Sequence, residues 1–413
     1  MEHLKDWEIL KDQLINKDEN EVLSQFFNFA FHHNLSIALW RHPHHTEKHL
    51  ILDLSGAINY VKADLEELDD GFILSPFSDE GEGRNIFIHN HLYYNTEKKA
   101  LKTSPYLNSE DNNHLKLEKL LANLGATFNQ PNGKKTAFHT LKNSPVSVDG
   151  KSHYLGMVQK AIEAIKAGKF NKVVPARQQK VTLKAGFDLI ETFEKSCQLY
   201  PNALVSVVSV PGIGTWLGAT PEELISFDRS KIFRTVALAG TQKINDESDL
   251  MEVAWRQKEI EEQAMVSRYI INCFKKIRLR EFEEKGPRTA RAGELAHLKT
   301  DFLVDTVATN FPQLATVMLK LLHPTSAVCG MPKEPARQFL LDNENFDRSF
   351  FSGFLGPVNM FEETHLFVNI RCMQLFATEA ILYAGAGVTA ISDVEKEWEE
   401  TNLKQQTMLK VLS

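Results

Sequence analysis

The sequence predicts an α+β fold with large, mostly antiparallel sheets. Strand-like apolar runs follow one another after residue 172 without strict alternation with helices, an order that favours antiparallel pairing. Helical patterns over residues 250–284 and at the C-terminal end lie between or after them. The 413 residues are 43% apolar and 24% charged, which is typical of a globular chain with a sizeable core.

The elements can be followed in order from the N-terminal end. Residues 1–110 mix short helical and strand patterns, and the polar segments 103–115 and 127–153 indicate loops or a lobe boundary. An amphipathic helix is predicted over 154–168, with Gly168 as its stop. Strands are predicted over residues 172–183, 203–210, 224–227, 232–238, 365–376 and 380–383.

Charge and composition exclude several classes of protein. The net charge of −7 disfavours a broad nucleic-acid surface. No apolar run approaches the ~20 residues of a membrane-spanning helix, and the first residues show no apolar signal core. The cysteines are too scattered for a disulfide framework or a zinc site (Cys197, Cys273, Cys329 and Cys372). We expect a non-secreted, cytoplasmic protein.

Two short motifs invite functional interpretations that the sequence does not favour. The histidine-rich segment 42–49 has no nearby Cys or carboxylate that would complete a metal site, so we expect an exposed loop. Gly385 and Gly387 fit a dinucleotide-binding pattern, but no βαβ unit follows them. Their small size would still allow backbone N–H groups to approach a ligand carboxylate.

Carboxylates occupy unusual positions on two predicted helices. Over residues 249–285, Glu259 and Glu262 fall on or near the apolar stripe, where an unpaired carboxylate is costly. Over residues 393–412, Glu397, Glu400 and Lys404 share one face. Ser392 and Glu395 are expected to cap this second helix. Spacing alone leaves two interpretations open, a Mg²⁺ site with an anionic ligand or solvated charged faces.

Nine ordered blocks after residue 169 resemble the chorismate-binding enzyme family. This family includes isochorismate synthases and the chorismate-converting subunits of anthranilate and aminodeoxychorismate synthases. The blocks are residues 170–177 (FNKVVPAR), 218–222 (GATPE), 237–241 (ALAGT), 258–262 (KEIEE), 323–325 (HPT), 346–348 (FDR), 370–371 (IR), 382–387 (LYAGAG) and 397–404 (EWEETNLK).

The resemblance implies a chorismate-binding fold of two lobes, with large antiparallel sheets flanked by helices and an active site between them. Residues 1–150, which carry no such block, would be a variable N-terminal part, and residues 151–413 the catalytic region, intertwined as one unit. It also implies that Glu262 and Glu400 bind Mg²⁺, with Glu397 in the same shell.

The resemblance further implies how chorismate is bound and converted. Lys172 matches the lysine that activates water in isochorismate synthases, and Glu222 would be the general acid. The residues implied to meet the substrate carboxylates are Arg371, Lys404, Tyr383 and the backbone of Gly385 and Gly387. Those implied to line the same pocket are Gly240, Thr241 and His323.

Within the family, the resemblance favours isochorismate synthase. Ammonia-using members have a glutamine in place of Lys172, and aminodeoxychorismate synthases typically have a lysine in place of Ala239. Salicylate synthase, which also uses a lysine-activated water, is not separated by these motifs, and the anthranilate and aminodeoxychorismate synthases are further alternatives. We expect a monomer that needs no glutaminase subunit, no nucleic acid and no membrane.

Overall fold

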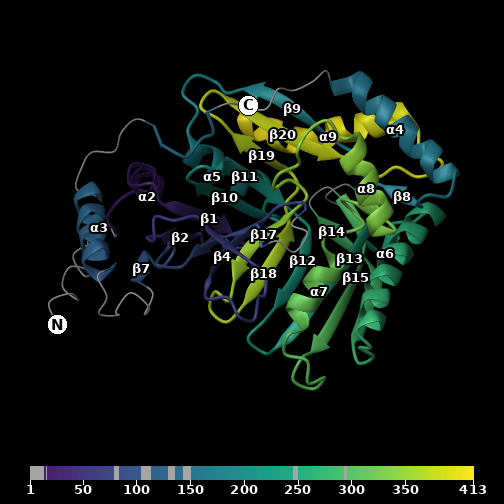
Figure 1. The fold of residues 1–413 in the computed structure, drawn as a ribbon, viewed down its shortest axis with the longest axis horizontal. Helices are drawn as coiled ribbons and strands as arrows, with labels where there is room; N and C mark the ends of the chain where they lie inside the picture. The colour runs from purple at the N-terminus through teal and green to yellow at the C-terminus, as the bar shows by residue number, and fades with distance from the viewer. Residues whose placement is uncertain are drawn as a thin grey trace.

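Two nine-stranded antiparallel sheets, covered by helices, form the computed structural model (Figure 1), as the α+β prediction requires. The structure describes residues 14, 16–78, 83–103, 113–128, 135–142, 150–244, 250–292 and 295–413. None of the helices in these ranges is both long and apolar enough to cross a membrane.

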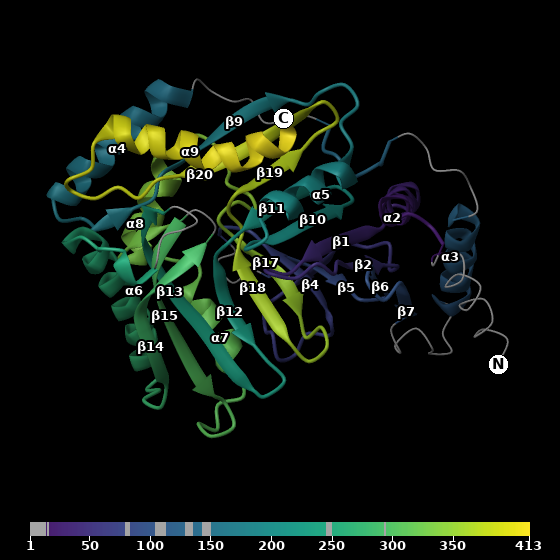
Figure 2. The ribbon, with the colours of Figure 1, turned by 180° about the vertical axis from the view of Figure 1, so that it is seen from behind.

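The first sheet combines strands from both ends of the chain. Helices α2, α5 and α9 pack on its outer face, and α4 lies beside α9 (Figure 2). Its strands in spatial order are β7 (Ala100–Thr103), β6 (Leu92–Asn95), β2 (His49–Asp53), β1 (Ser36–Arg41), β10 (Leu204–Val210), β11 (Gly214–Thr220), β19 (Cys372–Leu375), β20 (Glu379–Gly385) and β9 (Ala176–Thr182). The helices are α2 (Glu19–His33), α3 (Asn113–Phe128), α4 (Gly150–Lys166), α5 (Leu189–Leu199) and α9 (Val394–Leu412).

The second sheet is covered on its outer face by α6 (Gln257–Lys276) and α7 (Leu314–Leu322). Its strands in spatial order are β14 (Glu283–Ala292), β15 (Leu295–Asp305), β13 (Ile232–Lys243), β12 (Glu223–Phe227), β18 (Thr364–Val368), β17 (Phe354–Val358), β4 (Gly71–Ser75), β5 (Asn85–His89) and β3 (Asn59–Val61). Separately, β8 (Lys172–Val173) pairs with β16 (Gly330–Met331) beside α8 (Lys333–Asn343), and a 3₁₀ turn spans Leu250–Glu252.

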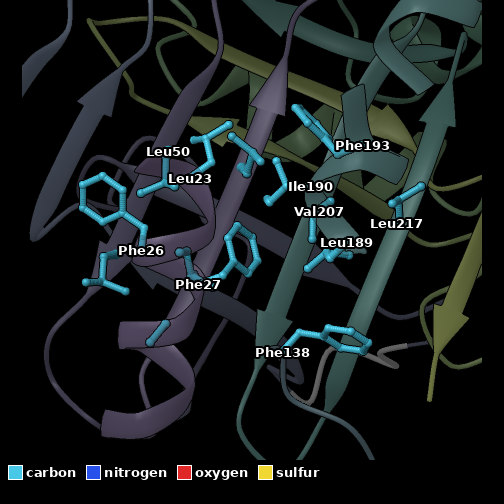
Figure 3. Packing of buried hydrophobic residues seen from close by; sticks show 14 of the residues in the cluster. Leu23, Phe26, Phe27, Leu50, Phe138, Leu189, Ile190, Phe193, Val207 and Leu217 are labelled. Atoms are coloured by element: carbon cyan, nitrogen blue, oxygen red, sulfur yellow. The ribbon is translucent and has the colours of Figure 1, made fainter. Parts of the chain in front are cut away.

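Side-chain alternation along the strands produces separate cores on the two faces of each sheet. On β11, Leu217 faces the outer core with α2 and α5, whereas Trp216 faces the second sheet. Figure 3 shows the outer core, where Phe26 and Phe27 of α2 and Phe193 of α5 lie over the first sheet. The core between the sheets holds Trp40, Trp216, Phe72, Ile88 and Phe367, among others.

Strands from before residue 150 form one end of each sheet, and strands from after it form the rest. In the first sheet β1 pairs with β10, and in the second sheet β4 pairs with β17. Because these pairs lie in the interior of each sheet, the N-terminal part is built into the same two sheets that carry the nine sequence blocks.

Backbone geometry corrects two of the predicted elements. The helix predicted over 249–285 is wrong at both ends, although residues 245–249 lie outside the described ranges: α6 spans Gln257–Lys276, and Glu283–Ala292 form β14 instead. Arg278, with a φ of 59°, stops the helix. The strand predicted over 365–376 is two strands, because Arg371, with a φ of 51°, turns the chain from β18 in one sheet to β19 in the other.

Other sequence predictions meet mixed outcomes. The predicted C-terminal helix is confirmed as α9, but its N-cap is Asp393, whose side chain accepts from Lys396 N at 3.0 Å, rather than a Ser392–Glu395 box. The histidine-rich segment is only partly an exposed loop, since His49 is buried in β2 with its Nδ1 2.8 Å from Tyr93 Oη. Helices α5, α7 and α8 lie outside the predicted helical ranges.

Candidate active site

The short strand β8 places Lys172 beside the loop that follows β20. On one edge β8 pairs with β16, and Asn171 N donates to Met331 O at 2.7 Å. On the other edge Val173 exchanges two hydrogen bonds with Val388, of 3.1 and 2.8 Å. Pro175 follows directly, and its ring restricts the preceding residue to extended backbone. Lys172 is thus held by main-chain contacts on both sides.

The Lys172 side chain lies against Gly387. A Cβ added at Gly387 would sit 3.1 Å from Lys172 Cε and 3.7 Å from its Nζ. The pKa of Lys172 is lowered from its ordinary value of 10.5, chiefly because burial disfavours the charged ammonium. The Lys404 charge adds to this effect, while the carboxylates of Glu262, Glu222 and Glu400 oppose it.

Glu222 lies in the short link between β11 of the first sheet and β12 of the second sheet. Its main-chain carbonyl accepts from Val368 N at 2.9 Å, and Thr220 Oγ1 donates to Val368 O at 2.6 Å, so this corner is tied to β18. Burial raises the pKa of Glu222 above its ordinary value of 4.5, against the opposing charges of Lys172, Arg371 and Lys404. The shifts of Lys172 and Glu222 therefore run in opposite directions, each toward its uncharged form.

Two cations accompany this pair. Lys404 on α9 donates to Gly385 O at 2.8 Å and forms an ion pair of 2.7 Å with Glu400. Burial lowers the pKa of Lys404 and of Arg371, and each of them interacts with the charge of Glu400. Because an arginine fork and a lysine ammonium bind carboxylates well, this region suits an anionic ligand.

The acidic side chains of α6 and α9 lie on the more open part of the same region. Glu262 and Glu400 are both exposed, and the negative charge of each favours the charged form of Lys172. Among the described residues no group of three or more His, Cys, Asp and Glu side chains is arranged to hold a metal ion. Mg²⁺ often uses one or two carboxylates and completes its shell with water and substrate oxygens. Glu262 and Glu400 have the donor chemistry for that mode.

The other predicted pocket residues lie in varied surroundings. Gly240 adopts a φ of +67° at a bulge of β13, and its added Cβ would be 3.0 Å from Glu259 Cβ, so glycine is required there. Thr241 follows it, paired with His297 of β15. Glu397 lies one turn before Glu400 on α9 and is half-buried.

His323 and Tyr383 have contacts away from the charged groups. His323 Nε2 is 3.3 Å from Pro76 O, its ring packs against Phe354, and burial lowers its pKa to about 4. Tyr383 is buried between the sheets, stacked on Trp216 and Phe351. Their roles in substrate binding stay predictions.

Sequence reasoning missed His297. Its Nδ1 lies 3.1 Å from Gly240 O, and its pKa is lowered by burial and by the charge of Arg371, which places it beside the predicted pocket. One sequence signal was available: His297 lies between Ala296 and Leu298, whose buried side chains point to the opposite face of β15.

Solved structures share the fold over nearly the whole chain. The isochorismate synthase MenF of Escherichia coli aligns with a TM-score of 0.73 at 20% identity, covering 96% of this chain and 92% of that one. Anthranilate synthase component I from Streptococcus pneumoniae aligns with a TM-score of 0.63 at 20% identity, covering 95% and 86% of the two chains.

Comparison of sequences identifies the family. The isochorismate synthase EntC of Escherichia coli is 30% identical over 260 residues, which cover 62% of this chain and 66% of EntC, just under two thirds of its length. The isochorismate synthase DhbC of Bacillus subtilis is 28% identical over 297 residues, 69% of this chain and 73% of DhbC. Residues 78–413 match the family described as chorismate binding enzyme, and the chain belongs to that family.

Proposed function

We propose that this protein is an isochorismate synthase, which isomerises chorismate to isochorismate with Mg²⁺. The observation that carries the proposal is the pair Lys172 and Glu222. Burial lowers the pKa of the lysine and raises that of the glutamate, and the two side chains also interact electrostatically with each other. Two titratable groups driven toward a neutral base and a neutral acid are the arrangement that acid–base catalysis needs.

The reaction exchanges one hydroxyl position for another. Lys172 takes a proton from water as the water oxygen adds to ring carbon 2, and the ring double bonds shift. The hydroxyl on carbon 4 departs with the proton of Glu222 and leaves as water. One water is consumed and one is released, so no oxidant or reductant is required. Return of the proton from Lys172 to Glu222 restores both groups for the next turnover.

Binding of the dianionic substrate is assigned to the cations and the acidic helices. Arg371 and Lys404 would pair with substrate carboxylates, beside the backbone of Gly385 and Gly387. Glu262 and Glu400, with Glu397 on the same helix, would hold Mg²⁺. When bound, the ion would offset the charge of a ring carboxylate, which allows an anionic substrate to enter a protein of net charge −7. Gly240, Thr241, His323 and Tyr383 are proposed to line the pocket.

The use of water as the nucleophile distinguishes the proposed reaction from those of the ammonia-using members of the family. A lysine at position 172 supports activation of water, and Ala239 leaves no amine nucleophile at that position. The reaction therefore needs no glutaminase partner. Relatives named as isochorismate synthases include one designated menaquinone-specific and one designated vibriobactin-specific.

Product analysis tests the proposal directly. The purified chain is incubated with chorismate and either Mg²⁺ or EDTA, and the products are separated by HPLC with fluorescence detection. Isochorismate formed only with Mg²⁺ is the expected result. Salicylate with pyruvate would assign the chain to the salicylate synthases instead, and an amino product that depends on ammonium would assign it to the anthranilate or aminodeoxychorismate synthases. Absence of all turnover would refute a catalytic role.

A further inference from the structure

A buried ion pair beside β8 takes no part in the chemistry described above. Arg348 and Glu344 follow α8, and their side chains are 3% and 5% exposed. Removing two charges from water costs several kcal/mol unless hydrogen bonds satisfy the remaining donors and acceptors. The contacts that satisfy this pair therefore indicate what it holds together.

The side-chain hydrogen bonds of the pair to the main chain lead to the segments around Lys172, while the Arg348 guanidinium also lies over the ring of Phe77. Arg348 Nη2 donates to Val174 O at 2.7 Å, just after β8, and Nη1 donates to Val328 O at 2.9 Å, just before β16. Arg348 Nε donates to Glu344 Oε2 at 2.7 Å. Glu344 Oε1 accepts from Ala176 N at 2.9 Å, at the start of β9.

The small sheet that carries Lys172 needs such support. Strands β8 and β16 have two residues each, and an isolated two-stranded ribbon is at best marginally stable. Main-chain bonds to Val388 hold the edge of β8 that does not pair with β16, and the ion pair holds the residues that directly follow β8 and precede β16.

We propose that Arg348 and Glu344 are positioning residues, which hold the Lys172 main chain so that its amine meets the reacting water. The proposal rests on the function proposed above. Arginine is suited to this role because its planar fork reaches two carbonyls and a carboxylate at once, whereas a lysine ammonium is a single point.

The test compares variants of the pair with a matched buried arginine. Arg348→Lys, Glu344→Ala and Glu344→Gln are measured beside Arg41→Lys. Arg41 is 2% exposed and binds the carbonyls of His42, Tyr200 and Pro201, which are not candidate site residues. For each variant, kcat and KM for chorismate and the Mg²⁺ requirement are measured at a temperature where thermal unfolding shows the protein folded.

A positioning role predicts a loss confined to kcat. Since a shift of about 1 Å can cost about 10²-fold in rate, Arg348→Lys should lower kcat roughly 10- to 100-fold, with KM and the Mg²⁺ requirement within about twofold of wild type. Glu344→Gln, which keeps an acceptor oxygen, should recover much of the kcat lost in Glu344→Ala. Arg41→Lys should lower the melting temperature and leave kcat within about twofold.

Three results would overturn the proposal in distinguishable ways. If Arg348→Lys is folded and retains wild-type kcat, the pair does not position the base. Equal loss of kcat in Arg348→Lys and Arg41→Lys would assign a purely structural role. If the wild-type protein forms no isochorismate, the proposed function fails and this inference fails with it. Should Arg348→Lys not fold, the comparison of Glu344→Gln with Glu344→Ala decides the question.

Discussion

Replacing Gly387 with alanine is a sensitive test of how tightly the base is placed. The added Cβ would lie 3.1 Å from Lys172 Cε, closer than ordinary van der Waals contact between carbon atoms, which begins near ~3.5 Å. The backbone at Gly387 is not in the left-handed region, so alanine adopts the same conformation without strain. The steric effect therefore falls on the Lys172 side chain.

The size of the effect follows from this distance. Restoring ordinary contact requires the amine to move by roughly 0.3–0.5 Å, and about 1 Å costs about 10²-fold in a positioned reaction, so kcat should fall roughly 4- to 10-fold. Overpacking, which costs about 1 kcal/mol or more, is partly offset by the reduced entropy of the unfolded chain, worth about 0.4–1 kcal/mol. Stability should change little.

Steady-state conversion of chorismate at saturating Mg²⁺ is the assay. Gly156→Ala on α4 is the matched control, because nothing lies within 4 Å of its added Cβ. A fall in kcat with unchanged KM supports contact with the base. A rise in KM with unchanged kcat would instead show that Gly387 serves substrate binding, as the sequence alone suggested, and wild-type kinetics would refute both roles.

Further predictions concern the charged groups and their titration. Lys172→Ala and Glu222→Gln should each lower turnover by about 10²–10⁴-fold while calorimetry still detects chorismate binding; normal turnover in either variant would remove that residue from the scheme. Glu262→Ala or Glu400→Ala should raise the Mg²⁺ concentration needed for half-maximal activity, and an unchanged titration would exclude the residue as a ligand. The pH profile of kcat/KM should be bell-shaped because the active form has a neutral lysine and a protonated glutamate; the apparent pKa values belong to the pair, with the pKa of Lys172 lowered and that of Glu222 raised by burial. Burial lowers the pKa of His49 from 6.5 to about 4, so the unfolded chain binds more protons between these values. The free energy of unfolding should therefore fall by about 2 kcal/mol for this group as the pH drops from 7 to 5, and a His49→Gln variant with the same pH dependence in urea titrations would contradict this.

Much of the architecture could be predicted because it depends on local patterns. Helical periodicity ending at Gly168 indicated α4, and the apolar run near residue 204 indicated β10. The candidate site residues came from short motifs, since a resemblance over nine ordered blocks fixes the positions of Lys172 and Glu222 without any knowledge of their surroundings.

The sequence by itself determined the fold class, the family and the candidate residues, whereas tertiary structure decided their environment. The backbone turn at Arg278 ends a helix, and the turn at Arg371 takes the chain from one sheet to the other. The local hydrophobic pattern indicates neither turn. The depressed pKa of Lys172 depends on burial by segments distant in sequence. Likewise, Arg348 meets Val174 across 174 residues, a contact that only packing of the whole chain creates. Periodicity reports which residues are buried, but long-range packing decides which of them meet.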